Sequence, residues 1–300
     1  MNLLSFLDQL GAADAPVGAA PRRHLLRQFG QAGARAAAAA LPLALAAPAA
    51  QAAPTDTSLD AILVVLRLED TLEAFYTKAL AAAVLTNPAQ AGVRPDFVRI
   101  LRHQHEHADF LRATITAAGL PRPVAPPLTS YDFSGRRNNP ANPELFPNVL
   151  TDYNAFLQLA QQLEDASASV YLGQLKFFSS DRPLLDALVR MQLVEARHAS
   201  HIRTLRRTSA AAVAVKSWPS TADPAPNPAI MVPGTGSGST APVSLYSLEA
   251  NETQAVLDAT TIPFPTVLTN TTAVQFRALA EAFDEPLLTV QATALLNIFS

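Results

Sequence analysis

The sequence predicts an all-α fold organised as a four-helix bundle, and three observations support this prediction. Apolar residues recur at helical spacing in four segments, at about residues 57–85, 94–118, 148–179 and 183–209. The connection between the second and third segments, residues 119–147, is long and rich in proline and glycine. Motifs of the first two segments recur in the last two at a nearly constant offset, which indicates a duplicated helical hairpin.

The start and stop signals of the four segments agree with these bounds. Asp56 or Ser58 is expected to cap the first helix, because short polar side chains accept a hydrogen bond from the first turn. Pro95 suits the first turn of the second helix, and Gly119 ends that helix. Asp181 is expected to cap the fourth helix. One long crossover between the second and third helices is the ferritin-like arrangement of a four-helix bundle.

The remainder of the chain divides into an N-terminal segment and a C-terminal extension. We place the bundle at residues 53–216 and the extension at residues 217–300. Residues 217–243 are rich in proline, glycine, serine and threonine, which is typical of a linker. Two further helices are predicted after it, at about 271–283 and 285–298. The sequence does not indicate a function for the extension.

Residues 1–52 are predicted to be a targeting segment. Arg22-Arg23 precedes an alanine-rich apolar run, and Ala50-Gln51-Ala52 follows as a small-residue cleavage site. The arginine pair is similar to a twin-arginine signal, which predicts a periplasmic or otherwise exported protein. The alternative is a flexible alanine-rich arm. Prolines interrupt the apolar run and leave it shorter than the ~20 residues of a membrane span, so no stable membrane insertion is expected after signal removal.

Composition and motifs exclude several function classes. The formal net charge of −3 gives no reason to expect nucleic acid as a partner. The chain has no cysteine, so disulfides, thiolate metal sites and cysteine catalysis are excluded. It also has no glycine-rich phosphate loop after a strand, no nucleophile elbow and no HExxH motif. Five of the six histidines lie in two short segments, 103–107 and 198–201, as expected for a site.

Carboxylates on apolar helix faces mark the candidate site. Glu69, Glu164 and Glu195 each lie in an otherwise apolar stripe, where an unpaired buried charge would be costly. Glu195 and His198 are three residues apart and therefore lie on one face of the fourth helix. His107 faces inward from the second helix. Carboxylate and imidazole donors suit iron, manganese or zinc.

Four motifs resemble the bacterial ferritin-like domain family that is exported by the twin-arginine route. LEDTLEAFY and HADFLRATI are similar to its first two helices, and LEDASASVYLGQL and VEARHASHIRTL to its third and fourth. The resemblance covers about residues 57–209 and implies a di-iron carboxylate site. It implies iron as the cofactor, with ferroxidase or peroxide-protective chemistry. The metal ligands that it implies are Glu69, His107, Glu164, Glu195 and His198.

Gln104 departs from the family pattern, because a glutamate is expected three residues before His107. An amide cannot supply the negative oxygen pair of a carboxylate, so two divalent ions would lack one compensating charge. Three outcomes stay open: one ion held by Glu164, Glu195 and His198, a weakened dinuclear site, or no metal. His103 shares part of the inward face and is a candidate substitute ligand. The alternative function is a metal-free bundle with a structural or stress-associated role in the cell envelope, and a homodimer is open in either case.

The residues around the candidate ligands are expected to support them. Tyr76 and Tyr171 are predicted to pack in the core with their hydroxyls bonded to carboxylates around the site. Asp70 and Asp165 are predicted to accept hydrogen bonds from the ligating histidines. Glu73 is open between joining the site and forming an ion pair. Two further histidines, His105 and His201, are predicted to be solvated surface residues.

Overall fold

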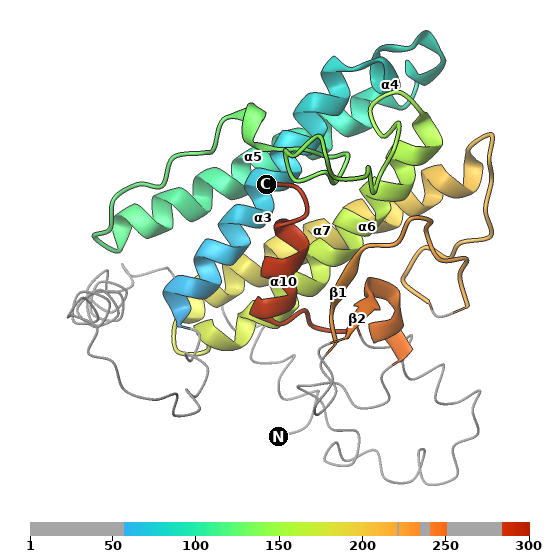
Figure 1. Ribbon diagram of the computed structural model, residues 1–300. Helices are drawn as coiled ribbons and strands as arrows, with labels where there is room; N and C mark the ends of the chain where they lie inside the picture. Colours follow the sequence, from blue (N-terminus) through green and yellow to red (C-terminus); the bar gives the residue numbers. More distant parts are fainter. Residues whose placement is uncertain (1–56, 221, 235–240, 251–283) are drawn as a thin grey trace, which may run out of the picture.

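The computed structural model describes residues 57–220, 222–234, 241–250 and 284–300. Within them, two helical hairpins pack side by side, and a short helix near the C-terminus crosses in front of both (Figure 1). This arrangement confirms the predicted ferritin-like bundle, with only a small sheet added to it. The bundle helices are α3 (Ser58–Ala81), α5 (Arg94–Ala117), α6 (Tyr153–Gln174) and α7 (Arg182–Thr208).

Short-range hydrogen bonds fix the starts of helices α3 and α7, and the sequence predicted the capping residue of α7 but not that of α3. The cap of α3 is Thr57 and not Asp56 or Ser58, because the Thr57 hydroxyl accepts from the Asp60 backbone while the Asp60 carboxylate accepts from the Thr57 backbone. Extended backbone at Ala82 then separates α3 from the one-turn helix α4 (Ala83–Thr86). Asp181 caps α7 as predicted, accepting from Leu184 N at 3.1 Å.

The third bundle helix, α6, is the most enclosed element. It begins at Tyr153 and not near 148, because the Asp152 carboxylate caps it at 2.8 Å from Ala155 N. From Phe156 to Gln174, every residue except Gln158 and Leu172 is buried. The helix therefore has no solvated face, since α3, α7 and the C-terminal extension cover it on different sides. In the part of the chain that the structure describes, no helix is long and apolar enough to cross a bilayer.

The crossover at residues 119–147 is irregular but packed. Its turn η2 (Leu128–Ser130) leads into Tyr131 and Phe133, which are buried. Phe133 contacts both Phe75 of α3 and Phe299 near the C-terminus. The crossover therefore covers part of the core with these aromatic side chains, while most of its other residues are exposed.

The segment expected to be a linker instead packs against the bundle. Strands β1 (Met231–Pro233) and β2 (Pro242–Ser244) pair in an antiparallel ladder. Just before β1, the Gln162 amide of α6 accepts from Ile230 N at 2.6 Å and donates to Pro228 O at 3.0 Å. A proline-rich chain makes few backbone hydrogen bonds to itself. Here glutamine side chains of α6 form hydrogen bonds with its backbone N–H and C=O groups instead.

The C-terminal residues form a strap over α3 and α6. Helix α10 (Thr289–Leu296) is shorter than the helix predicted at 285–298, because Leu288 is extended and Gln291 caps it. Leu287 N donates to Ser169 O of α6 at 2.9 Å. A Cβ atom at Gly173 would lie 1.9 Å from Leu287 O, so only glycine permits this close approach. The predicted targeting segment 1–52 and the predicted helix at 271–283 lie outside the described residues.

Candidate metal centre

The five predicted ligands converge in the middle of the bundle. They come from all four helices: Glu69 from α3, His107 from α5, Glu164 from α6, and Glu195 and His198 from α7. The three glutamates are fully buried, and both histidines are nearly so. Helical periodicity explains the convergence, because each side chain lies on the apolar stripe that its helix turns to the core.

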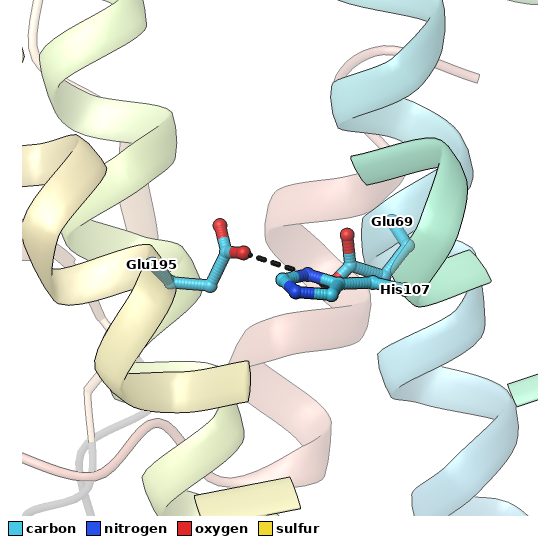
Figure 2. Close-up of side chains that lie close together, drawn as sticks. All are labelled: Glu69, His107 and Glu195. Carbon is cyan, nitrogen blue, oxygen red and sulfur yellow. Dashed lines mark ion pairs between the residues drawn. The ribbon is translucent and has the colours of Figure 1, made fainter. Parts of the chain in front are cut away.

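The donor atoms form two overlapping triads that share Glu195. One consists of Glu69, His107 and Glu195, and the other of Glu164, Glu195 and His198. Within each triad, one donor atom per residue lies within 4.8 Å of the others. Figure 2 shows the first triad, in which Glu195 and Glu69 approach the His107 ring from opposite helices. We refer to these as the Glu69 triad and the Glu164 triad.

The Glu69 triad holds three donor atoms without a hydrogen-bond partner. His107 Nδ1 lies 3.0 Å from Glu195 Oε1 and 3.3 Å from Glu69 Oε1, but the ring is not oriented to place a proton on a line to either oxygen. Counting every described residue, His107 Nδ1, Glu195 Oε1 and Glu69 Oε2 are buried and lack a hydrogen bond. Such groups are rare in a folded protein and require an explanation.

In the Glu164 triad, the amide of Gln104 occupies the space between the donors. Gln104 Nε2 lies 3.1 Å from Glu195 Oε2, 3.5 Å from Glu164 Oε1 and 3.5 Å from His198 Nδ1. Carboxylate oxygens only accept hydrogen bonds, so the amide nitrogen and not its oxygen must face them. Gln104 is fully buried and is therefore part of the centre, although its amide does not act as a fourth carboxylate.

The two tyrosines bind the candidate ligands directly, which differs from the prediction that they would bond surrounding carboxylates. Tyr76 of α3 donates to Glu164 Oε1 of α6, and Tyr171 of α6 donates to Glu69 Oε1 of α3. Each hairpin thus supplies the hydrogen bond that orients the glutamate of the other. Ser167 also belongs to the centre and was not predicted, since its Oγ donates to Glu195 Oε2 at 3.1 Å. Its position three residues after Glu164, on the same face of α6, could have indicated this.

The prediction for Asp70 and Asp165 was wrong. Asp70 pairs with Arg112, and Asp165 pairs with Arg203 through two hydrogen bonds of 2.9 and 2.6 Å. In each hairpin, the arginine five residues after the histidine forms an ion pair with the aspartate. A buried carboxylate is stabilised more by a guanidinium than by a neutral imidazole. These pairs join the two helices of each hairpin and do not reach the histidines.

The comparison with known proteins agrees with this architecture. The profile of the ferritin-like domain family matches residues 58–208, from the start of α3 to the end of α7. The chain belongs to the ferritin-like domain family. A search of curated proteins finds no match to the chain. In this ferritin-like domain, the buried acidic and histidine cluster has the composition and spacing to hold a metal.

In the ferritin-like centre, the pKa of the shared carboxylate, Glu195, is shifted in the opposite direction to those of Glu69 and Glu164. Burial raises the pKa of Glu69 and Glu164 to about 7, with the charge of Glu195 adding to the rise. Glu195 is equally buried, but contacts with His107 and His198 on its two sides hold its pKa below the ordinary range. Burial alone would lower the pKa of the histidines, and the neighbouring carboxylates raise it to about 10.

A groove leads from the surface to the histidines of this ferritin-like domain. Its volume is about 540 Å³, and it is lined by side chains of α5 and α7 that include His103, Glu106, His107, His198 and His201. His103 Nδ1 lies 2.9 Å from His198 Nε2, on the side of the ring away from the carboxylates, so His103 is not in either triad. The groove therefore gives solvent a path to the edge of the centre.

The remaining candidates lie outside the centre. His105 is exposed, as predicted, and contacts Glu73 at 3.0 Å, which places Glu73 in an ion pair and not in the site. His201 is half-buried and contacts Asp96 at 3.1 Å.

The residues of the centre fit a divalent transition metal. The unpartnered atoms are acceptors or imidazole nitrogens that point into a buried space, and each can donate a lone pair to a cation. Two carboxylates and one imidazole in each triad form a donor set typical of iron, manganese and zinc sites. A metal-free polar core would instead be expected to satisfy these atoms with hydrogen bonds.

Proposed function

We propose that this ferritin-like protein binds iron, or a similar divalent metal, at the centre of its bundle. The observation that carries the proposal is the pair of buried triads sharing Glu195, with three donor atoms of one triad left without hydrogen bonds. The candidate ligands are the carboxylates of Glu69, Glu164 and Glu195 and the imidazoles of His107 and His198, and each triad offers two carboxylates and one imidazole to a cation. Bound iron supplies one-electron chemistry toward dioxygen or peroxide, which supports a ferroxidase-like or peroxide-protective role.

The protein's own residues would prepare the site for this chemistry. Tyr76 and Tyr171 orient the two outer glutamates through hydrogen bonds from their hydroxyls, so an oxygen of each carboxylate is fixed before a cation arrives. Apolar helix faces exclude bulk water, while the groove between α5 and α7 admits small reactants. His103 holds His198 in place from the groove side.

Export by the twin-arginine route remains a prediction from residues 1–52. It suits the proposal, because that route carries folded and metal-loaded proteins. Cell fractionation of a strain that expresses the full chain, beside an Arg22→Lys/Arg23→Lys variant, measures it. A homodimer likewise remains a prediction, to be measured by light scattering.

Metal analysis of the purified protein tests the central proposal. Protein loaded with Fe²⁺ under anaerobic conditions should retain metal after desalting, and exposure to peroxide should oxidise the iron faster than in buffer alone. Each Fe²⁺ gives one electron, and peroxide takes two electrons and two protons to form two water molecules. Retention of no metal by the wild type would refute the proposal and favour the structural alternative, for which the Gln104 amide between the Glu164 triad donors is the supporting observation.

A further inference from the structure

The two triads are not equally prepared for a cation. The difference lies in what already occupies their acceptor atoms, and it deepens the proposed function, on which it rests. The sequence favours the Glu164 triad, because Glu195 and His198 stand on one rigid helix. The hydrogen bonds favour the other triad.

In the Glu164 triad, one oxygen of each glutamate already accepts hydrogen bonds from the protein, whereas Glu164 Oε2 accepts none from the described residues. Glu195 Oε2 accepts from Gln104 Nε2 and from Ser167 Oγ, each at 3.1 Å. Glu164 Oε1 accepts from Tyr76 and lies 3.5 Å from the same amide nitrogen. Gln104 Nε2 therefore stands where a cation would otherwise face these oxygens. To hold a cation here, the protein would have to break the amide contacts and turn the amide oxygen inward.

The Glu69 triad offers the opposite situation. One donor from each of its residues, namely Glu69 Oε2, His107 Nδ1 and Glu195 Oε1, lacks a hydrogen bond among the described residues. No protein donor has to leave before a cation binds. The two carboxylates also balance the charge of one divalent ion, whereas two ions in the whole centre would face only three carboxylates.

The geometry points to a mononuclear site: we propose that the Glu69 triad binds one divalent ion, and that Gln104 keeps the Glu164 triad closed to a second one. Gln104 is then the residue that sets the stoichiometry. It acts as a resident hydrogen-bond donor in the position where a carboxylate would complete a dinuclear centre. Glu195 serves both halves, with Oε1 toward the ion and Oε2 toward the amide.

Paired histidine variants test this assignment. Wild type, His107→Ala and His198→Ala are titrated with Mn²⁺, and bound ions per chain are counted by native mass spectrometry. We expect one ion in the wild type, one in His198→Ala, and an affinity at least ~100-fold weaker in His107→Ala. Gln104→Glu should raise the count from one to two. Anomalous diffraction from Mn²⁺ in wild-type crystals locates the ion without any variant, so the test holds even where a variant fails to fold.

The outcomes separate this inference from the proposed function. Metal lost in His198→Ala but kept in His107→Ala would overturn the assignment while leaving a metal protein. Two ions in the wild type, or an anomalous peak beside His198, would overturn it in the same way. Only a wild type that binds no ion at all would refute the proposed function itself.

Discussion

The two hairpins, α3–α5 and α6–α7, resemble each other in almost every contact of the centre. Each places one glutamate on its first helix and one histidine on its second. Each joins its helices by a buried aspartate and arginine, and each sends a tyrosine hydroxyl to the glutamate of the other hairpin. The main departure in the centre is at the position three residues before the histidine, which is Gln104 in α5 and Glu195 in α7.

This single difference makes a symmetric frame chemically asymmetric. The Gln104 amide donates to Glu195 Oε2, whereas Glu195 Oε1 accepts no hydrogen bond from the described residues and faces His107 at 3.0 Å. Had both positions been glutamate, two negative charges would face each other across the centre, and a second cation would be needed to stabilise them. A duplicated fold therefore does not guarantee a duplicated site.

The largest effect on metal binding is expected from a substitution at Glu195, the carboxylate that both triads share. Glu195→Gln removes the only side chain that belongs to both triads and leaves amides at both equivalent positions. We expect loss of Mn²⁺ binding by more than the roughly 10- to 100-fold that outer-sphere changes cost, measured by calorimetric titration. Glu164→Gln is the matched control and should retain the ion. Equal losses in the two variants would contradict the asymmetry.

The buried arginines should differ in their contribution to stability. Arg203 donates to Asp165 twice, to Asp223 at 2.9 Å and to Trp218 O at 3.1 Å. Within the described residues, the Arg112 side chain pairs with Asp70 alone. Arg203→Met should lower the free energy of unfolding by about 3–5 kcal/mol, because two carboxylates lose their counter-charge. Arg112→Met should cost less.

Urea denaturation of the metal-free protein measures both arginine variants. A second substitution, Asp165→Asn in the Arg203→Met background, should recover part of the loss, since it removes one uncompensated charge. Equal destabilisation by the two single variants would show that the contacts of Arg203 with the extension contribute nothing.

The bundle and the convergence of its polar residues could be predicted from the sequence, because both follow from helical periodicity and from the duplication. Glu69 and Glu164 were found as charges in apolar stripes, and no tertiary information was needed. The tyrosine contacts were only partly predicted. A buried hydroxyl needs an acceptor, but the sequence does not show that the acceptors are Glu164 and Glu69.

The errors concern choices between partners that are distant along the chain. Asp70 had a histidine and an arginine as possible partners, and only the packing of α5 on α3 decides for Arg112. Residues 217–243 were predicted to be a linker because they are rich in proline, glycine, serine and threonine and show no periodicity. Part of this segment is instead held by hydrogen bonds to Gln158 and Gln162 of α6, more than 60 residues earlier. The role of Gln104 likewise depends on atoms of two other helices.

A smaller difference is expected between the two tyrosines, in what each contributes to the stability of the metal-free protein. Tyr171→Phe should leave Glu69 without a hydrogen-bond donor from the described part of the chain, whereas Tyr76→Phe leaves Glu164 with the Gln104 amide at 3.5 Å. An unsatisfied buried acceptor costs about 1–3 kcal/mol, so Tyr171→Phe should be the more destabilising change in the metal-free protein. Thermal unfolding in chelator compares the variants. Reversed ranking would mean that the amide does not support Glu164.

The smallest difference between the hairpins is expected in their response to pH, because His107 and His198 both have a pKa raised from 6.5 to about 10. A histidine that binds its proton more tightly when folded stabilises the protein fully below pH 6.5, and this contribution disappears as pH rises through 10. The pKa of Glu69 and of Glu164 is raised from 4.5 to about 7, so these two carboxyl groups also make the folded state less stable as the pH rises from about 4.5 to 7. The metal-free protein should therefore lose stability steadily from about pH 5 to pH 10.

Metal should reverse that slope. A cation competes with protons for the same carboxylate and imidazole atoms, so the stabilisation by Mn²⁺ should grow as pH rises. Melting temperatures between pH 5.5 and 8.5, with and without Mn²⁺, measure both slopes. Without metal, His107→Gln and His198→Gln should flatten the decline equally, because the pKa of each histidine is raised by two adjacent glutamates. With metal, only His107→Gln should abolish the rise, because within the described part of the chain only the Glu69 triad, of the two, has an atom without a hydrogen bond on each of its three residues.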